Sequence, residues 1–590
     1  MVYLGRPSKG CQMCRTRRIK CDETKPTCNQ CSKARRQCPG YRDEFDLLLR
    51  NENQAAARRA LKANTASASS SSGSSSSGSK KAIALKSSQP HPRQQALQLS
   101  RSQTAALANS LSIPAEDLAT CHFLSNFVLV PQQEQHSARG YNHFLLPLLQ
   151  QYSNGTNKEE ITHLKHAFNA CALASLGERY GAPGPGRGHG RMTTGKEKET
   201  LLRKGAEEYT LALMATNAAL RDPVRCKEDG TLAAVLLLGM FENITARPNT
   251  GSAWGSHVEG AVQLVKARGK KQLKTNLGLQ LFIVVRSQLI IHNLITATPP
   301  TMGVSWWVNE DTNSDPTATA SERLNLLTAE LRSEVYGFFS SPLSLSSSSP
   351  SAIAAIKEFL ARAQALDAEA VEWFATLPPS WQIEYIPYSS SGNENIFPGV
   401  VHVYPDMWTA AILNLARATR MVLMSIIVRC VAFLVRPGDY RTTPEYAFAA
   451  RTASNVVGDI IASIPFHLGH LPPRKDKNGK PMENSLTGRG LGGYFLTWPL
   501  ACVVSHDHVT NSQREYVRGR LKYIGDELGI KYARLLSTQL KIRLPSMLIY
   551  EDGRLAAAAA ESKIPGANSV GGTAGAVMRA AGLTSRLKSV

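Results

Sequence analysis

Residues 11–38 read CQMCRTRRIKCDETKPTCNQCSKARRQC and contain six of the eleven cysteines in the chain. The pattern C-x2-C-x6-C occurs twice, with six residues between the two copies. A zinc ion takes four ligands in a tetrahedron, so two independent ions would need eight. With six cysteines, two sulfurs must bridge both ions, and the duplication points to the first cysteine of each copy. The predicted ligands are Cys11 and Cys28 as bridges, together with Cys14, Cys21, Cys31 and Cys38.

A metal must be part of this fold, because about 30 residues cannot bury enough apolar surface to fold alone. Three other interpretations compete with a DNA-binding zinc module. They are a disulfide framework, a structural zinc knob that docks on another protein, and a redox thiol pair. The regular spacing and the basic loops disfavour all three.

The loops between the cysteines are strongly basic. Residues 1–40 contain ten Lys or Arg against only Asp22 and Glu23. Six thiolates around two Zn²⁺ ions take away two charges, which leaves about +6 on a very small body, as expected of a phosphate binder. The whole chain has a formal net charge of +22 and a pI near 9.6, which also favours a polyanionic partner.

The stretch from Cys11 to Cys38 resembles the fungal Zn2Cys6 binuclear cluster family, without a spacing defect. The resemblance implies two Zn²⁺ ions per chain and two short helices, one after each C-x2-C, joined by a loop at Pro26. It also implies double-stranded DNA as the partner, with a CGG-like triplet read in the major groove. The base contact of the family maps to Arg18, where relatives often have Lys, and an arginine fork suits guanine O6 and N7.

The basic residues of the module fall into two expected roles. Arg18 is expected to read a base, with Arg17 and Lys20 as supporting contacts. Phosphate contacts position the protein without specifying a sequence, and we assign them to Arg15, Lys25, Arg35 and Arg36. The alternative for any one of these side chains is a solvated surface charge.

The chain is expected to divide into five parts. Residues 1–41 form the zinc module and 42–63 a short helix. Residues 64–115 form a disordered Ser-rich linker, because the run ASASSSSGSSSSGSKK cannot build a core. Residues 116–550 form a large all-α regulatory domain, and 551–590 an Ala/Gly-rich disordered tail.

The stretch 42–63 bears on whether two copies of the chain act together. Members of the family often dimerise here through a coiled coil, which needs apolar positions held over three or four heptads. This stretch offers barely one, around Phe45, Leu48 and Leu49. A homodimer and a short docking helix or tether both stay open.

Residues 116–550 carry helical patterns and little strand-like alternation, the best strand being Ile383 to Tyr388. Apolar runs at 231–241, 281–296 and 421–435 are interpreted as buried helices, not membrane spans, since one is too short and Arg286 and Arg429 interrupt the others. Each of these two arginines needs a partner that the sequence does not name.

Several motifs in this region resemble the fungal-specific regulatory domain that accompanies such clusters. They are WGSHVEGA ending in Arg268-Gly269, then LPPSW, YPD followed by Asn414 and Arg417, SIP, and GGY leading to WPL. Trp254 and Trp498 are expected to be core aromatics, and His257 a packed histidine. A small-molecule effector is compatible with the resemblance, although no residue identifies one.

The sequence argues against an enzymatic function. It has no G-x-S-x-G, no H-E-x-x-H, no P-loop lysine motif and no G-x-G-x-x-G after a strand. We therefore expect a nuclear, zinc-dependent regulator of RNA polymerase II genes that binds DNA, contacts the transcription machinery or co-regulators, and has no membrane partner. A DNA-bound repressor or scaffold without activating power remains the alternative, because no acidic residue follows Glu561.

Overall fold

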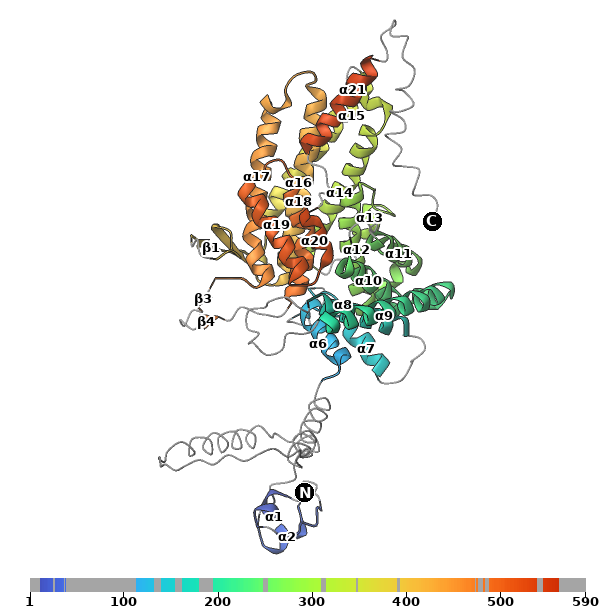
Figure 1. The fold of residues 1–590 in the computed structure, drawn as a ribbon, viewed down its shortest axis with the longest axis vertical. Helices are drawn as coiled ribbons and strands as arrows, with labels where there is room; N and C mark the ends of the chain where they lie inside the picture. The colour runs from blue at the N-terminus through green and yellow to red at the C-terminus, as the bar shows by residue number, and fades with distance from the viewer. Residues whose placement is uncertain are drawn as a thin grey trace, which may run out of the picture. The chain divides into compact units, whose positions relative to one another are not determined.

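The structure of the chain is a computed structural model. It describes residues 11–17, 19–24, 27–36, 38, 113–131, 139–153, 162–179, 195–247, 253–308, 315–345, 349–389, 393–472, 474–475, 481–482, 488–538 and 545–561. They belong to two compact units, residues 1–106 and 107–590, each described here by itself (Figure 1). The helix predicted at 42–63, and all but the last residues of the linker predicted at 64–115, lie outside the described residues.

The first unit contains two short helices, α1 (Gln12–Thr16) and α2 (Asn29–Lys33). The family resemblance implied a short helix after each C-x2-C pair; each helix in fact begins directly after the first cysteine of the pair and contains the second. Among the described residues of this unit, the buried side chains are those of Cys11, Cys14, Cys28 and Cys31. No aliphatic core is present in the described part, so packing alone does not account for this fold.

The first half of the second unit is a succession of helices packed on one another (Figure 1). Short 3-10 turns separate some of them, including η2 (Arg225–Lys227) and η3 (Lys270–Lys274). The helices are α6 (Ala115–Phe127), α7 (Leu145–Ser153), α8 (Thr162–Arg179), α9 (Gly195–Arg221), α10 (Asp229–Thr245), α11 (Ala253–Arg268), α12 (Asn276–Thr296), α13 (Val304–Trp307) and α14 (Pro316–Phe339).

The second half continues the same helical architecture, which confirms the all-α prediction for this part of the chain. Its 3-10 turns are η5 (Pro342–Leu345), η6 (Pro379–Trp381) and η7 (Tyr440–Thr442). Its helices are α15 (Pro350–Ala375), α16 (Met407–Leu434), α17 (Pro444–Leu468), α18 (Arg489–Val504), α19 (Asn511–Asp526), α20 (Lys531–Thr538) and α21 (Pro545–Glu561).

The apolar runs of the sequence form the core of this unit. Helices α12 and α16 are long and apolar enough to cross a membrane by length and composition, yet 72% of the apolar window of each is buried inside the protein. Every residue of α10 from Gly230 to Phe241 is buried as well. The three runs are therefore core helices, as predicted.

The two arginines that interrupt these runs each have a carboxylate partner. Arg286 on α12 is 2% exposed and forms an ion pair with Glu322 on α14. Arg429 on α16 binds Asp552 on α21 through two hydrogen bonds of 2.7 and 2.8 Å, and its guanidinium lies 3.9 Å from the centre of the Phe339 ring. Paired in this way, a buried guanidinium is tolerated in an apolar helix.

The pairing with Asp552 also corrects the predicted end of the domain. We expected residues 551–590 to form a disordered tail, but residues 551–561 continue helix α21. The physical reason is the buried charge of Arg429, which requires an anion, and Asp552 supplies it from beyond the predicted boundary. The remaining residues of the predicted tail, 562–590, lie outside the described part.

Strands are few and short in the described part. Strands β1 (Glu384–Tyr388) and β2 (Gly399–Val403) pair antiparallel, with Glu384 opposite Val403 and Tyr388 opposite Gly399. The predicted strand is therefore present. Its Pro387 has no N–H to donate, and it is tolerated because, among the described residues, no third strand pairs with β1. Strands β3 (Arg474–Lys475) and β4 (Pro481–Met482) form a second small hairpin.

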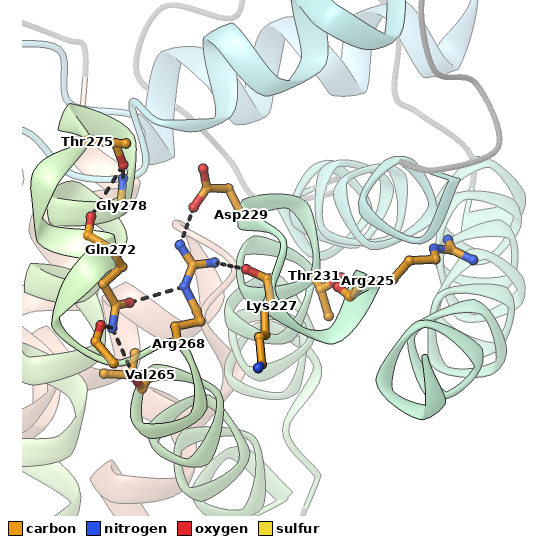
Figure 2. A network of polar contacts seen from close by, with 10 residues as sticks. Arg225, Lys227, Asp229, Thr231, Val265, Arg268, Gln272, Thr275 and Gly278 are labelled. Atoms are coloured by element: carbon orange, nitrogen blue, oxygen red, sulfur yellow. Dashed lines mark hydrogen bonds and ion pairs between the residues drawn. The ribbon is translucent and has the colours of Figure 1, made fainter. Parts of the chain in front are cut away.

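The Arg268-Gly269 end of the first regulatory motif joins three helices (Figure 2). The guanidinium of Arg268 forms an ion pair with Asp229 at the start of α10 and donates to the carbonyl of Lys227 at 3.0 Å. Gly269 has a φ of +63°, a backbone conformation that favours glycine. The amide of Gln272 then donates to the carbonyls of Val265 and Gly269, which ends α11. This motif is a helix junction.

The other motifs also have packing roles. Asp406 caps α16 by accepting from the backbone N–H of Thr409 at 2.7 Å. On α16, Arg417 donates to the hydroxyl of Tyr404 at 2.7 Å, and Asn414 donates to the hydroxyl of Ser463 on α17. The partners of Asn414 and Arg417 here are thus side chains of other segments. The result is a polar tie between α16 and α17 inside the core.

Candidate zinc centre and nucleic-acid interface

The structure brings the six cysteine sulfurs of the first unit together in two overlapping groups. One group is Cys11, Cys14, Cys21 and Cys28, the other Cys11, Cys28, Cys31 and Cys38, and within each group the sulfurs lie within 4.8 Å of one another. The two groups share Cys11 and Cys28, whose sulfurs are 3.7 Å apart. Each group offers four soft donors around one point, the donor set that zinc prefers.

The backbone places the two shared sulfurs by the same local device. The N–H of Cys14 points at the sulfur of Cys11 at 3.4 Å, and the N–H of Cys31 points at the sulfur of Cys28 at 3.3 Å. In each copy the first cysteine therefore receives a helix-start amide, and Cys28 is the N-cap of α2. Donors of this kind stabilise a thiolate, which is the form that binds a metal.

The environment of the buried thiols fits a bound metal ion. Burial raises the pKa of the Cys31 thiol to about 12 and also raises the pKa of the Cys14 thiol. Without a cation these sulfurs would carry protons at neutral pH. A zinc ion supplies the positive charge that keeps coordinating thiols deprotonated. The donor set and the burial therefore both match zinc.

One residue that supports the site was missed by sequence reasoning, which treated it only as a charge. The carboxylate of Asp22 accepts a hydrogen bond from the hydroxyl of Thr24 at 2.7 Å and another from the backbone N–H of Asn29 at 3.1 Å. The hydroxyl of Thr24, with these backbone contacts, lowers the pKa of Asp22. Asp22 thus connects the loop after Cys21 to the first residue of α2. An Asp directly after the third cysteine was the only signal in the sequence.

The described basic side chains of the unit lie on its surface. Arg17, Lys20, Arg35 and Arg36 are all exposed. Arg18 and Lys25, which the sequence assigned to base and phosphate contacts, lie outside the described residues, and the side chain of Arg15 is not described. The structure therefore places four of the seven predicted DNA-contacting side chains, and it places them where a polyanion can reach them.

Comparison with known proteins gives two family matches in this order along the chain. The fungal Zn(2)-Cys(6) binuclear cluster domain matches residues 9–47. The fungal specific transcription factor domain matches residues 121–373, which ends inside α15. The later motifs, from LPPSW to WPL, lie beyond that match. No solved structure matches the chain.

Three curated relatives illustrate the similarity. Transcription factor dbaG of Emericella nidulans is 36% identical over 152 residues, which is 26% of this chain and 35% of that protein. White-opaque regulator 2 of Candida albicans is 49% identical over 49 residues, 8% of this chain and 11% of the relative. Transcriptional regulatory protein moc3 of Schizosaccharomyces pombe is 61% identical over 36 residues, 6% and 7% of the two chains.

The matched stretches span at most about a third of the length of these relatives, and the shorter ones are little longer than the cysteine cluster. The cluster domain of this family binds two zinc ions, in agreement with the two groups of four sulfurs. Transcription factors are not enzymes, which agrees with the missing catalytic motifs. The chain belongs to the fungal transcription factors that combine a Zn(2)-Cys(6) binuclear cluster with a fungal-specific transcription factor domain.

Proposed function

We propose that this protein is a zinc-dependent, sequence-specific regulator of RNA polymerase II genes that acts in the nucleus. The observation that carries the proposal is the convergence of six sulfurs into two groups sharing Cys11 and Cys28, in a unit with an exposed basic surface. The exposed positive charge of the described part of this unit suits the phosphates of DNA.

Within this proposal each cysteine has a role. Cys14 and Cys21 bind one zinc ion, Cys31 and Cys38 bind the other, and Cys11 and Cys28 bridge the two. The chemistry that the ions supply is structural, because four thiolates close the coordination shell. The cluster holds α1 and α2 at a defined distance and thereby orients the basic loops that follow them.

The DNA-reading roles follow the loops. Arg18, which follows α1 in the sequence, reads guanine in a CGG-like triplet, and the exposed Arg17 and Lys20 support this contact. Arg15, Lys25, Arg35 and Arg36 hold phosphates, which fix the register and orientation of the module on the duplex.

Selection of bound sites from random double-stranded DNA by the full chain tests this function. We expect CGG-like triplets to be enriched, and their spacing and orientation to report whether a homodimer binds. Absence of any enriched triplet from zinc-loaded protein would contradict the proposal. Arg18→Ala should relax the base preference by about 1–3 kcal/mol, whereas Arg36→Ala should weaken all sequences alike and reduce the salt slope.

The direction of regulation is tested separately. The absence of acidic residues after Glu561 favours a repressor or scaffold as the second candidate, since an acidic-hydrophobic activating segment is not visible there. A reporter with selected sites upstream distinguishes the two: activation requires output to rise with the full chain, whereas the repressor lowers it. Both outcomes leave the DNA-binding proposal intact.

A further inference from the structure

A cavity of about 230 Å³ lies in the helical unit between α14, α16, α18 and α21. On α14, Arg332, Val335 and Tyr336 are spaced three and four residues apart and so share the face that lines it. Half of the remaining lining residues are aliphatic, including Met421 and Ile426 of α16. A cavity of this composition has an apolar body with a few polar groups, as small-molecule sites usually have.

Arg332 brings a positive charge to the cavity that no described residue balances. Its Nε is buried without a hydrogen-bond partner, and no carboxylate in the described part of the chain pairs with its guanidinium. Burial lowers the pKa of Arg332, and the neighbouring Arg429 lowers it further. An arginine in a protein nevertheless keeps its proton, so the charge remains. The side chain as a whole is partly exposed, but its buried Nε lacks an acceptor, which an anion in the cavity would supply.

His506 contributes a second donor without an acceptor. Its side chain is 5% exposed and lines the same cavity. The backbone N–H of His508 points at its Nδ1 at 3.4 Å, which places the ring proton on Nε2. Burial lowers the pKa of His506 to about 4, so the ring is neutral at pH 7. Among the described residues, its buried Nε2 has no partner.

Trp498 adds a third donor to this wall. It lines the cavity and is 7% exposed, and its indole N–H is buried without an acceptor among the described residues. Three N–H donors from α14, α18 and the segment after α18 therefore lack acceptors around one cavity. A buried donor that is left unsatisfied costs about 1–3 kcal/mol. An anion in the cavity would bring acceptors to this wall.

The carboxylates around the cavity are already engaged. Asp552 accepts from Nε and Nη2 of Arg429, at 2.7 and 2.8 Å. Asp507, next to His506, accepts from the backbone N–H of Ser546 at 2.8 Å and from its hydroxyl at 2.5 Å. Neither carboxylate pairs with Arg332. An anion for Arg332 would therefore have to come from a residue outside the described part or from a bound molecule.

A neighbouring cavity provides an internal comparison. It has a volume of about 140 Å³, shares Ile295 and Trp498 with the first, and is lined by no Lys, Arg or His among the described residues. Its charged residue is Glu322, which is neutralised by Arg286. This second cavity therefore offers no attraction to an anion, and the uncompensated charge is confined to the cavity of Arg332.

We propose that the cavity lined by Arg332 and His506 binds a small organic carboxylate. The carboxylate oxygens accept from the guanidinium of Arg332 and from Nε2 of His506, and the apolar part of the molecule packs against Val335, Met421 and Ile426. Charge-assisted hydrogen bonds of this kind are about twice as strong as neutral ones. The proposal concerns the helical unit alone and does not depend on how the zinc module reads DNA.

Calorimetry and thermal unfolding of the full, zinc-loaded chain test the proposal with octanoate, its neutral analogue octanamide, and inorganic phosphate. We expect octanoate at millimolar concentration to bind and to raise the melting temperature. Octanamide and phosphate should do neither, the first for lack of charge and the second for lack of an apolar body. The proposal is overturned if octanoate fails to bind, or if either of the other probes binds as well as it does.

Variants locate the site. Arg332→Met keeps an unbranched apolar stem but removes the guanidinium, and it should weaken octanoate binding by about tenfold or more, the loss expected for a charge-assisted pair. Without ligand it should unfold no earlier than the wild type, because it removes a partly buried charge that has no carboxylate partner among the described residues. His506→Phe, which removes only the neutral donor, provides a second variant with a smaller loss.

Arg362→Met is the matched control. Arg362 lies on α15, where it binds Glu334 through two hydrogen bonds and does not line the cavity. It should bind octanoate as the wild type does. Wild-type affinity in both Arg332→Met and His506→Phe would overturn the assignment of the carboxylate to this cavity.

Discussion

The two units of this protein differ in the interactions that stabilise their folds. In the zinc unit the described buried side chains are four cysteines, and no aliphatic core is present among the described residues of that unit. In the helical unit one large apolar core extends from α6 to α21, and several charges within it are paired, such as Arg286 with Glu322, Arg332 being an exception. The first fold should therefore depend on a metal and the second on burial, and each should survive loss of what holds the other.

The largest expected effect is the loss of one bridging cysteine. Cys28→Ser should unfold the zinc unit and abolish DNA binding, because structural zinc contributes about 10–16 kcal/mol to such small folds. Metal analysis, DNA binding and circular dichroism of the full chain measure the outcome, and we expect the helical signal to persist. Cys121→Ser, at an exposed cysteine of α6, is the control and should retain two zinc ions. If Cys28→Ser melted the helical unit too, the two units would not be independent.

A buried charge in the helical unit should give the next largest effect. Glu322→Gln leaves the guanidinium of Arg286 without its anion, which should cost about 3–5 kcal/mol of the free energy of unfolding. Urea unfolding followed by circular dichroism measures it, with zinc content and DNA affinity expected to be unchanged. Glu369→Gln breaks the exposed pair with Arg323 and should cost only about 0–1 kcal/mol. Equal losses would show that burial is not what distinguishes the two pairs.

The helical unit should also respond to acid through its buried histidines. Burial lowers the pKa of His467 to about 4 and that of His163 to about 4. Below a pH of about 6.5 these histidines become protonated in the unfolded chain but stay neutral in the folded one. The free energy of unfolding therefore falls as the pH drops from about 6.5 to 4. His467 alone should account for about 3 kcal/mol over that window. Above pH 7 both states are neutral at these sites and the effect is absent.

Replacement of His467 separates this effect from general acid unfolding. The Nδ1 of His467 lies 3.0 Å from the carbonyl oxygen of Ser463 and donates to it. Glutamine retains an N–H donor but does not titrate, so His467→Gln should flatten the fall of stability between pH 6.5 and pH 4. An unchanged slope would mean that other groups carry the acid sensitivity.

The same contrast explains how much the sequence could predict. Metal ligands can be recognised from their spacing in the sequence, so the six cysteines and their division into two groups could be anticipated from one stretch of chain. The core could be anticipated only by type: apolar runs indicated buried helices, and Arg286 and Arg429 demanded anions. Their partners, Glu322 and Asp552, could not be identified, because a partner distant in sequence is determined by how helices pack. For the same reason Asp552 was assigned to the tail.

Arg332 and His506 show the limit more clearly. Nothing in the sequence distinguishes Arg332 from the solvated arginines around it, since its lack of a partner appears only when α14, α16 and α18 are packed together. His506 and Trp498 are ordinary core residues by sequence. A binding site whose side chains are recognised by their lack of partners has no regular spacing in the sequence. A metal site built from repeated cysteines does.

The smallest expected effect concerns Asp22, which tests whether the zinc unit depends on the metal alone. Asp22→Ala removes the acceptor for the hydroxyl of Thr24 and for the backbone N–H of Asn29. Hydrogen bonds of this kind contribute about 1 kcal/mol, so zinc should still bind while DNA affinity falls by about five- to tenfold. Asp22→Asn keeps an acceptor oxygen and should recover most of the affinity. Full affinity in Asp22→Ala would show that the thiolate cluster by itself orients α2, which would sharpen the contrast with the helical unit. A loss of zinc would instead show that protein hydrogen bonds help to hold even a metal-built fold.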